Sequence, residues 1–182
     1  MSQPIPSIND RDLGCLLDQV QKPARYIGGE LGQVHKDLTD VTVRICLAFP
    51  DAYEIGMSHL GLRILYDHLN RDKRIWLERV FCPFPDMEKQ LRDAGLALFS
   101  IESRTPLHEF DVVGFSLQSE MTHTNLLTML DLGGIPLHRW ERRGDDPIIV
   151  AGGPVAFNPE PLSDFIDAFL VGEPGRFGRN GG

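Results

Sequence analysis

Three short loops of the sequence carry most of the residues that could bind a small ligand. They span residues 50–59, 116–122 and 152–161, and each follows a short apolar run typical of a β-strand. In open parallel sheets, ligands bind beyond the carboxyl ends of the strands, near the point where the strand order reverses. The sequence therefore predicts a ligand site where these loops meet at one edge of a sheet.

The loop residues have both binding and structural interpretations. Gly152 and Gly153 would let the backbone approach a flat or bulky ligand without an intervening Cβ. Ser116 and Ser119 precede an expected helix start, where hydroxyls and free N–H groups can bind an anion or a ring nitrogen. Equally, Asp51 and Ser119 could cap helices, and the two glycines could simply form a turn.

Several familiar chemistries have no motif in this sequence. There is no GxGxxG for a dinucleotide, no GxxxxGK[ST] for a nucleotide triphosphate, and no GxSxG for a nucleophilic serine. The cysteines at 15, 46 and 82 are too far apart to form a local CxxC or CxxxCxxC. We therefore expect no catalytic residue and no metal ligand within this chain.

Composition narrows the class of protein further. The 182 residues carry a formal net charge of −8, which disfavours a nucleic-acid-binding surface. No apolar run reaches the roughly 20 residues that a membrane span needs. The amino terminus also lacks the basic start and apolar stretch of a signal peptide. We expect a cytoplasmic protein that binds neither nucleic acid nor membrane.

Hydrophobic periodicity predicts alternating strands and helices after residue 40. Strands are expected at residues 41–49, 75–81, 111–115, 147–151 and 166–171, and helices at 59–69, 85–94 and 120–132. A further apolar segment covers residues 96–101. This order predicts an α/β fold with a five-stranded, parallel, Rossmann-like sheet in the flavodoxin-like order 2-1-3-4-5.

The expected organisation has three parts. Residues 1–40 form an amino-terminal helical extension, and residues 41–173 form the Rossmann-like domain. Residues 174–182 are rich in glycine and arginine, and we expect a disordered tail there that differs from the family described next.

Four longer motifs resemble a known family. The segments 23–30 (PARYIGGE), 49–58 (FPDAYEIGMS), 114–117 (GFSL) and 158–161 (NPEP) are similar to the amino-terminal, cobalamin-binding-type domain of large radical S-adenosylmethionine (SAM) proteins. The resemblance extends from about residue 20 to Glu173. It implies an auxiliary domain that holds a corrinoid or a substrate next to a radical core.

The resemblance also implies the residues that would bind a corrinoid. Cobalamin-binding domains carry Asp-x-His-x-x-Gly, then Ser-x-Leu or a near variant such as Ser-Leu, then Gly-Gly. The matching residues here are Asp51, Tyr53, Gly56, Ser116, Leu117, Gly152 and Gly153. Because Tyr53 stands where the family has its histidine, we do not expect histidine ligation of the cobalt.

In that family a barrel with CxxxCxxC follows, which binds a four-iron four-sulfur cluster and S-adenosylmethionine. We expect this chain to be truncated before that core, which would be its partner in the full-length protein, and to be non-catalytic alone. Two alternatives remain: an interaction or substrate-docking module that binds no corrinoid, and a small enzyme or receiver-like domain on the same fold.

Overall fold

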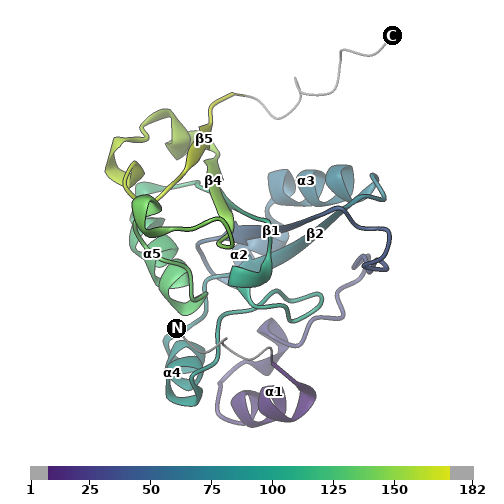
Figure 1. The fold of residues 1–182 in the computed structure, drawn as a ribbon. Coiled ribbons are helices and arrows are strands. Elements are labelled where there is room, and N and C mark those ends of the chain that lie inside the picture. Colours follow the sequence, from purple (N-terminus) through teal and green to yellow (C-terminus); the bar gives the residue numbers. More distant parts are fainter. Residues whose placement is uncertain (1–7, 173–182) are drawn as a thin grey trace.

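A computed structural model of the protein describes residues 8–172 and contains one five-stranded sheet (Figure 1). All strand pairs are parallel, and the order is β2-β1-β3-β4-β5. The strands are β1 (Val43–Phe49), β2 (Ile75–Phe81), β3 (Val112–Ser116), β4 (Ile148–Gly152) and β5 (Ala168–Leu170). The predicted fold class and strand order are therefore confirmed.

Five α-helices accompany the sheet in the described residues. They are α1 (Asp10–Leu17), α2 (Tyr53–Ser58), α3 (Leu60–Asn70), α4 (Pro85–Ala94) and α5 (His123–Leu132). Helix α4 starts at a proline and ends at Gly95, which has a φ of 64°. Both ends follow from the sequence, because proline suits the first helical position and glycine the left-handed C-cap.

Some elements differ from the predictions. Helix α2 lies inside the first loop, where no helix was predicted. Residues 120–122 form a 3₁₀ turn before α5 rather than its first turn. The apolar segment 96–101, for which no element was predicted, contains an isolated bridge from Phe99 to Pro106 and no longer strand.

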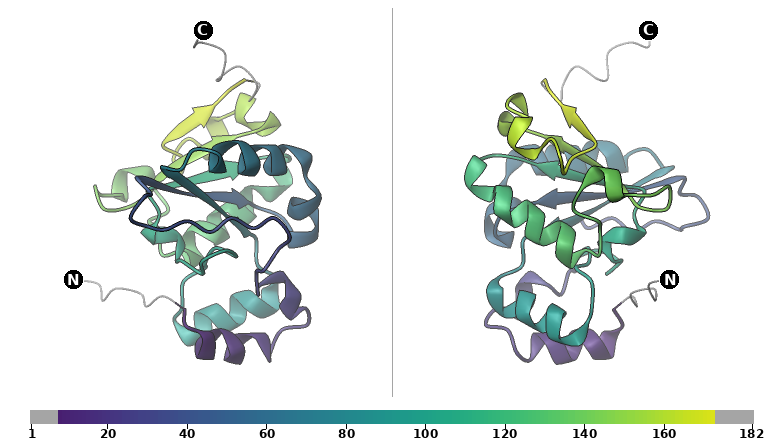
Figure 2. Two further views of the ribbon diagram at one scale, coloured as in Figure 1. Left: turned by 90° about the vertical axis from the view of Figure 1, so that its right-hand side faces the viewer. Right: turned by 60° about the vertical axis from the view of Figure 1, so that its left-hand side comes forward.

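The larger hydrophobic core lies on one face of the sheet. Alternate strand residues such as Cys46, Val113 and Phe115 point to this face and are fully or almost fully buried. Helix α5 lies on the opposite side of the sheet from α3 (Figure 1). Helices α1 and α4 pack side by side beyond the sheet and contribute Leu13 and Leu91 to the same core (Figure 2).

The other face is covered unevenly, and we call it the α3 face. Over β1 and β2, which we call the filled half, it carries a second cluster of buried side chains. This cluster consists of Leu47, Phe49, Leu62, Tyr66, Leu77, Phe81 and Ile101. Over β3, β4 and β5, which we call the bare half, Ile148 and Leu170 are each 56% exposed. Parallel sheets are normally covered on both faces, so the bare half is unusual.

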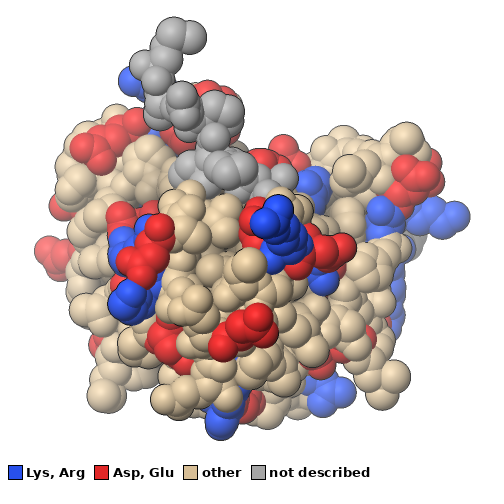
Figure 3. Space-filling view, turned by 90° about the horizontal axis from the view of Figure 1, so that it is seen from below, with Lys and Arg blue, Asp and Glu red and all other residues tan. Residues whose placement is uncertain are grey.

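The amino-terminal extension contains the expected helix, α1, whose Leu13 and Leu16 are buried against the rest of the molecule. The predicted tail at residues 174–182 lies outside the described residues. Among residues 8–172, no helix has the length and apolar character needed to cross a membrane. On the surface seen from below, acidic and basic side chains are interspersed (Figure 3).

Candidate ligand slot at the carboxyl edge of the sheet

A cavity of about 580 Å³ lies on the bare half of the α3 face, beside α3. We call it the slot. Strands β3 and β4 contribute Gly114, Ser116 and Gly152 to its lining, and Leu65 of α3 lines it from the helix side. Its volume falls in the range of pockets that hold small molecules or cofactors.

Two glycines create much of this space. A Cβ on Gly152 would come no closer than 3.7 Å to Leu170, and a Cβ on Gly114 would meet Val150 Cγ2 at 3.5 Å. Both are ordinary van der Waals distances, so either position could carry a side chain without a clash. Because glycine stands at both, the strand surface below the slot stays open.

Gly153 has a different role. Its φ is 102°, and a Cβ there would lie 2.5 Å from the carbonyl oxygen of Leu117. The backbone of the turn after β4 therefore requires glycine at this position, as the structural interpretation of the pair proposed. Gly153 also lines the slot, so the turn and the cavity share this residue.

The rim of the slot is polar. The side-chain amide of Gln118 donates to Ser116 Oγ at 3.0 Å, and both residues line the slot. Ser119 accepts from the backbone N–H of Met121 at 3.3 Å, so it caps the short helical turn, as one interpretation of the sequence held. Sequence reasoning had not singled out Gln118 as a binding residue.

Asp51 lines an adjoining cavity of about 130 Å³, which shares Ser116, Gln118 and His59 with the slot. Its Oδ1 accepts from the backbone N–H of Ala52 at 2.7 Å. The residue at the N-cap of α2 is Ala52, and no side chain caps this helix. The interpretation of Asp51 as a helix cap is therefore wrong.

Tyr53 lies outside the slot. Its hydroxyl donates to the carboxylate of Glu30, and its ring packs edge-on against Phe81 with centroids 5.3 Å apart. Burial, followed by the hydrogen bond to Glu30, raises the pKa of Tyr53 to about 12. The phenol is thus neutral and engaged by a residue of the amino-terminal extension.

Gly56 and Leu117 also lie outside the slot. A Cβ on Gly56 would approach the ring of Phe81 to 2.3 Å, so this glycine permits α2 to pack closely on β2. Leu117 is fully buried in the larger core. Of the predicted site residues, Ser116, Gly152 and Gly153 therefore line the slot and Asp51 lies next to it.

A pair of contacts, which we call the clasp, explains why Tyr53 faces away. Glu30 receives the Tyr53 hydroxyl, and Arg25 donates to Glu54 Oε1 from Nε at 3.0 Å and from Nη2 at 2.8 Å. The Arg25 guanidinium also lies 3.6 Å from the ring centroid of Phe84. Two of the motifs that carry the family resemblance, at 23–30 and 49–58, are thus joined to each other.

His59 lines the slot but is occupied by helix capping. Its Nδ1 accepts from the backbone N–H of Leu62 at 3.2 Å at the start of α3. In the neutral ring this leaves the proton on Nε2, whereas a metal-bound histidine normally ligates with one nitrogen and donates from the other. His59 is thus not arranged as a metal ligand. Its position at the start of the helix predicted over residues 59–69 was the available sequence signal.

The filled half contains buried ion pairs instead of a cavity. Glu102 accepts from Arg79 Nε at 2.7 Å and from the Arg79 backbone N–H at 2.6 Å. The Arg79 guanidinium stacks on the ring of Tyr66, 4.1 Å from its centroid. Burial raises the pKa of Glu102 to about 7, while Arg79 lowers it.

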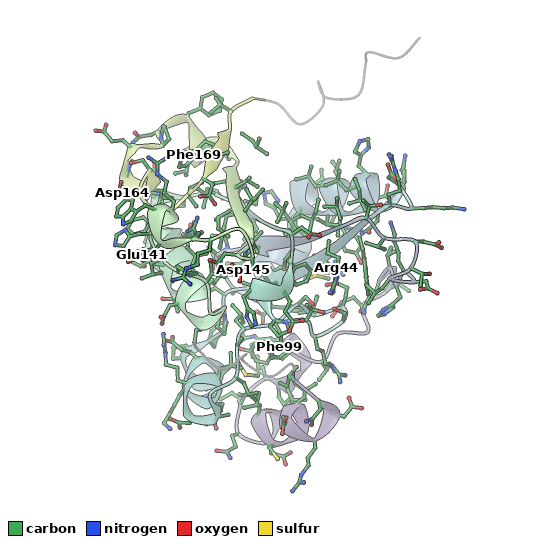
Figure 4. All side chains as sticks on the ribbon, viewed as in Figure 1. Arg44, Phe99, Glu141, Asp145, Asp164 and Phe169 are labelled. Carbon is green, nitrogen blue, oxygen red and sulfur yellow. The ribbon has the colours of Figure 1, made fainter. Side chains whose placement is uncertain are left out.

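On the opposite face of β2, Glu78 is completely buried. It accepts from Arg44 of β1 at 2.6 Å, from Ser100 at 2.7 Å and from the backbone of Ser103 at 3.0 Å. All of these hydrogen-bond partners of Glu78 belong to the domain itself. Figure 4 labels Arg44 among the side chains. Within residues 8–172, no group of three or more His, Cys, Asp or Glu side chains is placed to hold a metal ion.

Comparison with known proteins bears on this site. Residues 61–177, more than half of the chain, match the family model described as "Radical SAM proteins, N-terminal". The chain is also 25% identical over 131 residues to an uncharacterized protein of Methanocaldococcus jannaschii. That match covers 71% of this chain but only 23% of the archaeal protein.

Proposed function

This chain belongs to the amino-terminal domains of radical SAM proteins, and we propose from that premise that it holds a corrinoid for a radical core. The core, with its iron–sulfur cluster and S-adenosylmethionine, is supplied by the rest of the full-length protein. The proposed binding element is the slot, which receives the nucleotide tail of the corrinoid.

The observation that carries this proposal is the composition of the slot. Gly114 and Gly152 leave room for a flat ring against the strand backbone, since neither projects a side chain. Ser116 and Gln118 supply a hydroxyl and an amide at the rim, where the polar ribose and phosphate of a tail would lie. An apolar pocket with a few convergent polar groups is typical of a cofactor site.

Neither Tyr53 nor His59 is arranged to ligate cobalt. The Tyr53 hydroxyl is bound to Glu30, and the His59 ring caps α3. We therefore propose that the corrinoid is held through its tail and ring periphery, without an axial ligand from these residues. A bound corrinoid would supply a cobalt centre for methyl transfer or radical chemistry.

A second candidate function is a substrate-docking module that binds no corrinoid. The orientation of Tyr53 favours this candidate. Tyr53 stands where the family has its histidine, and its hydroxyl takes part in the clasp with Glu30 instead of facing the slot. In this case the slot would accept part of a substrate of the radical core. Both candidates use the same cavity, so a direct binding test separates them.

The test is retention of corrinoid by the purified protein. The protein is mixed with excess hydroxocobalamin and desalted, and the visible spectrum of the protein fraction is recorded. We expect retention near one equivalent. Gly152→Leu fills the slot without a backbone clash and should reduce retention more than tenfold. Gly144→Leu is the matched control, since nothing lies within 4 Å of its Cβ position.

A colourless protein fraction that is folded by circular dichroism would exclude corrinoid binding by this chain. Equal retention by Gly152→Leu and Gly144→Leu would exclude the slot as the site. A substitution at Gly153 would be a poor test, because the φ of 102° and the Leu117 carbonyl make any side chain disruptive there.

A further inference from the structure

The slot and its adjoining cavity together contain a single carboxylate. The slot is lined by apolar and neutral polar side chains and by His59. The adjoining cavity of about 130 Å³ adds Asp51, and no lysine or arginine of the described chain lines either cavity. A carboxylate without a nearby cation repels an anionic group of a ligand and attracts a hydrogen-bond donor. Asp51 therefore sets the charge that a ligand meets at this end of the slot.

Asp51 lies at the point where the strand order reverses. Phe49 ends β1 and Ser116 ends β3, and both line the small cavity, which therefore lies between these two strand ends. From this pair of strands, the sheet continues to β2 on one side and to β4 and β5 on the other. Open parallel sheets bind ligands in the crevice at such a point. A ligand in the slot that extends past Ser116 toward β1 meets Asp51.

The Asp51 carboxylate has an oxygen left for a ligand. Its Oδ1 accepts from the backbone N–H of Ala52 at 2.7 Å, and no other group in residues 8–172 donates to this side chain. The neighbouring hydroxyls are engaged locally. Ser119 Oγ accepts from the backbone N–H of Met121, and Thr122 Oγ1 donates to the carbonyl oxygen of Ser119 at 2.7 Å. Asp51 Oδ2 thus offers a ligand a charged acceptor, which makes stronger hydrogen bonds than a neutral one.

The tail and the ring of a corrinoid would meet different strands. Gln118 Nε2 lies 3.1 Å from the Cβ position of Gly153, so the polar contacts proposed for the tail lie over β3 and β4. Asp51 follows β1, on the other side of β3. Because neighbouring strands are about 4.8 Å apart, the ends of β1 and β4 are separated by roughly 10 Å. The anionic phosphate of the tail is thereby kept away from Asp51, while the neutral primary amides on the periphery of the corrin ring can reach it.

We propose that Asp51 determines the specificity of the slot: its carboxylate accepts from a primary amide of the corrin periphery and rejects a corrinoid with a carboxylate there. The inference rests on the proposed corrinoid function. It gives Asp51 a role that the helix-capping interpretation did not, and it needs no axial ligand to cobalt. Since two carboxylates about 4 Å apart repel each other strongly in a partly buried site, hydrolysis of that one amide should weaken binding by about tenfold or more.

Retention of amide and acid forms of the same corrinoid tests this inference. The protein is incubated with hydroxocobalamin or with each of its monocarboxylic acids, in which one primary amide is hydrolysed, and is then desalted. We expect the wild type to retain at least one acid isomer about tenfold less well than hydroxocobalamin. Asp51→Asn keeps an oxygen for the Ala52 N–H but removes the charge, so it should retain both forms about equally. Asp145→Asn is the matched control, because Asp145 is exposed and lines neither cavity, and it should discriminate as the wild type does.

Three results would overturn the inference while leaving corrinoid binding intact. These are equal retention of hydroxocobalamin and every acid isomer by the wild type, discrimination that persists in Asp51→Asn, and equal loss of discrimination in Asp51→Asn and Asp145→Asn. The last result would assign the effect to net charge. A folded wild type that retains no corrinoid would instead exclude the proposed function together with this inference. If Asp51→Asn does not fold by circular dichroism, Asp51→Ser removes the same charge, and it must lose the discrimination in the same comparison.

Discussion

The two halves of the α3 face differ in what fills them. Over β1 and β2, α3 buries Leu62 and Tyr66, and Arg79 pairs with Glu102 beneath them. Over β3 to β5, glycines lie at Gly114 and Gly152, and the space above them is open. The same sheet thus uses one half for packing and leaves the other for binding.

This difference between the two halves predicts whether a substitution changes stability or binding. Side chains of the filled half are held by several partners each, so their loss should lower the free energy of unfolding. Residues of the bare half have few partners, so their substitution should affect binding with little cost in stability. The following predictions test this division, from the largest effect to the smallest.

The largest effect is expected from Glu102→Ala. It removes the partner of Arg79 and leaves a buried guanidinium without a carboxylate. Breaking one side of a buried pair costs about 3–5 kcal/mol, and urea denaturation at pH 7 should show a loss of this size. A loss below about 1 kcal/mol would mean that the filled half does not depend on this pair.

The same carboxyl should impose a pH dependence. The pKa of Glu102 is raised by burial to about 7 from an ordinary value of 4.5, so the folded protein binds its proton more tightly than the unfolded chain. The part of the stability that comes from this tighter proton binding is therefore complete below about pH 4.5 and is lost as the pH rises through 7. The wild type should lose stability across this window relative to Glu102→Ala, as urea series from pH 4.5 to 8 would show. Parallel curves would contradict the prediction.

A smaller loss is expected for Gly28→Ala in the amino-terminal segment. Gly28 has a φ of 70°, and a Cβ would lie 2.1 Å from the carbonyl oxygen of Ile101 in the filled half. We expect a loss of about 3 kcal/mol in thermal or urea unfolding, from left-handed strain plus displacement of that backbone. Gly29→Ala is the control: its φ is 78° but nothing lies within 4 Å, so about 1 kcal/mol is expected. Equal losses would mean that the contact with Ile101 is unimportant.

Tyr53→Phe removes the hydrogen bond to Glu30 and should cost about 1 kcal/mol in stability. Corrinoid retention should be unchanged, because this side chain lies outside the slot. Tyr53→His should likewise fail to produce the spectrum of histidine-ligated cobalt, since the side chain at 53 faces the clasp. A ligated spectrum would show that position 53 can reach a bound corrinoid.

The smallest effect on stability is expected for Ser116→Ala in the bare half. Its hydroxyl has one side-chain partner, the amide of Gln118 at 3.0 Å, so the change in unfolding free energy should stay within about 0.5 kcal/mol. Corrinoid retention should fall, because the rim loses a hydrogen-bonding group. A stability loss near that of Glu102→Ala would contradict the division between the halves.

Local patterns predicted the sheet well. The strand Ile75–Phe81 was predicted to the residue, and the start of the helix Pro85–Ala94 was predicted correctly, because turn residues and Pro85 mark these ends. Helix α2 was missed since Gly56 lies within it and its side-chain-free contact with Phe81 has no local signature. Residues 96–101 are apolar because several of them pack into the core. Periodicity alone does not distinguish such a buried segment from a strand.

The site was predictable only in part. Fold topology alone brings Ser116, Gly152 and Gly153 together, since Ser116 and Gly152 end the neighbouring strands β3 and β4 and Gly153 follows directly. The Tyr53 side chain is oriented by its hydrogen bond to Glu30, which lies 23 residues earlier and meets it only in the folded chain. No local pattern reveals such a contact, so the sequence could not predict where the Tyr53 side chain lies.

The clasp has a consequence for how the sequence can change during evolution. Arg25 pairs with Glu54, and Glu30 with Tyr53, so an exchange at one position leaves its partner unmatched. We expect the segments 23–30 and 49–58 to co-vary among homologues, with loss of the charge at 25 accompanied by loss of the charge at 54. The two segments should therefore change together, and a chain begun at residue 41 would carry only one side of the clasp.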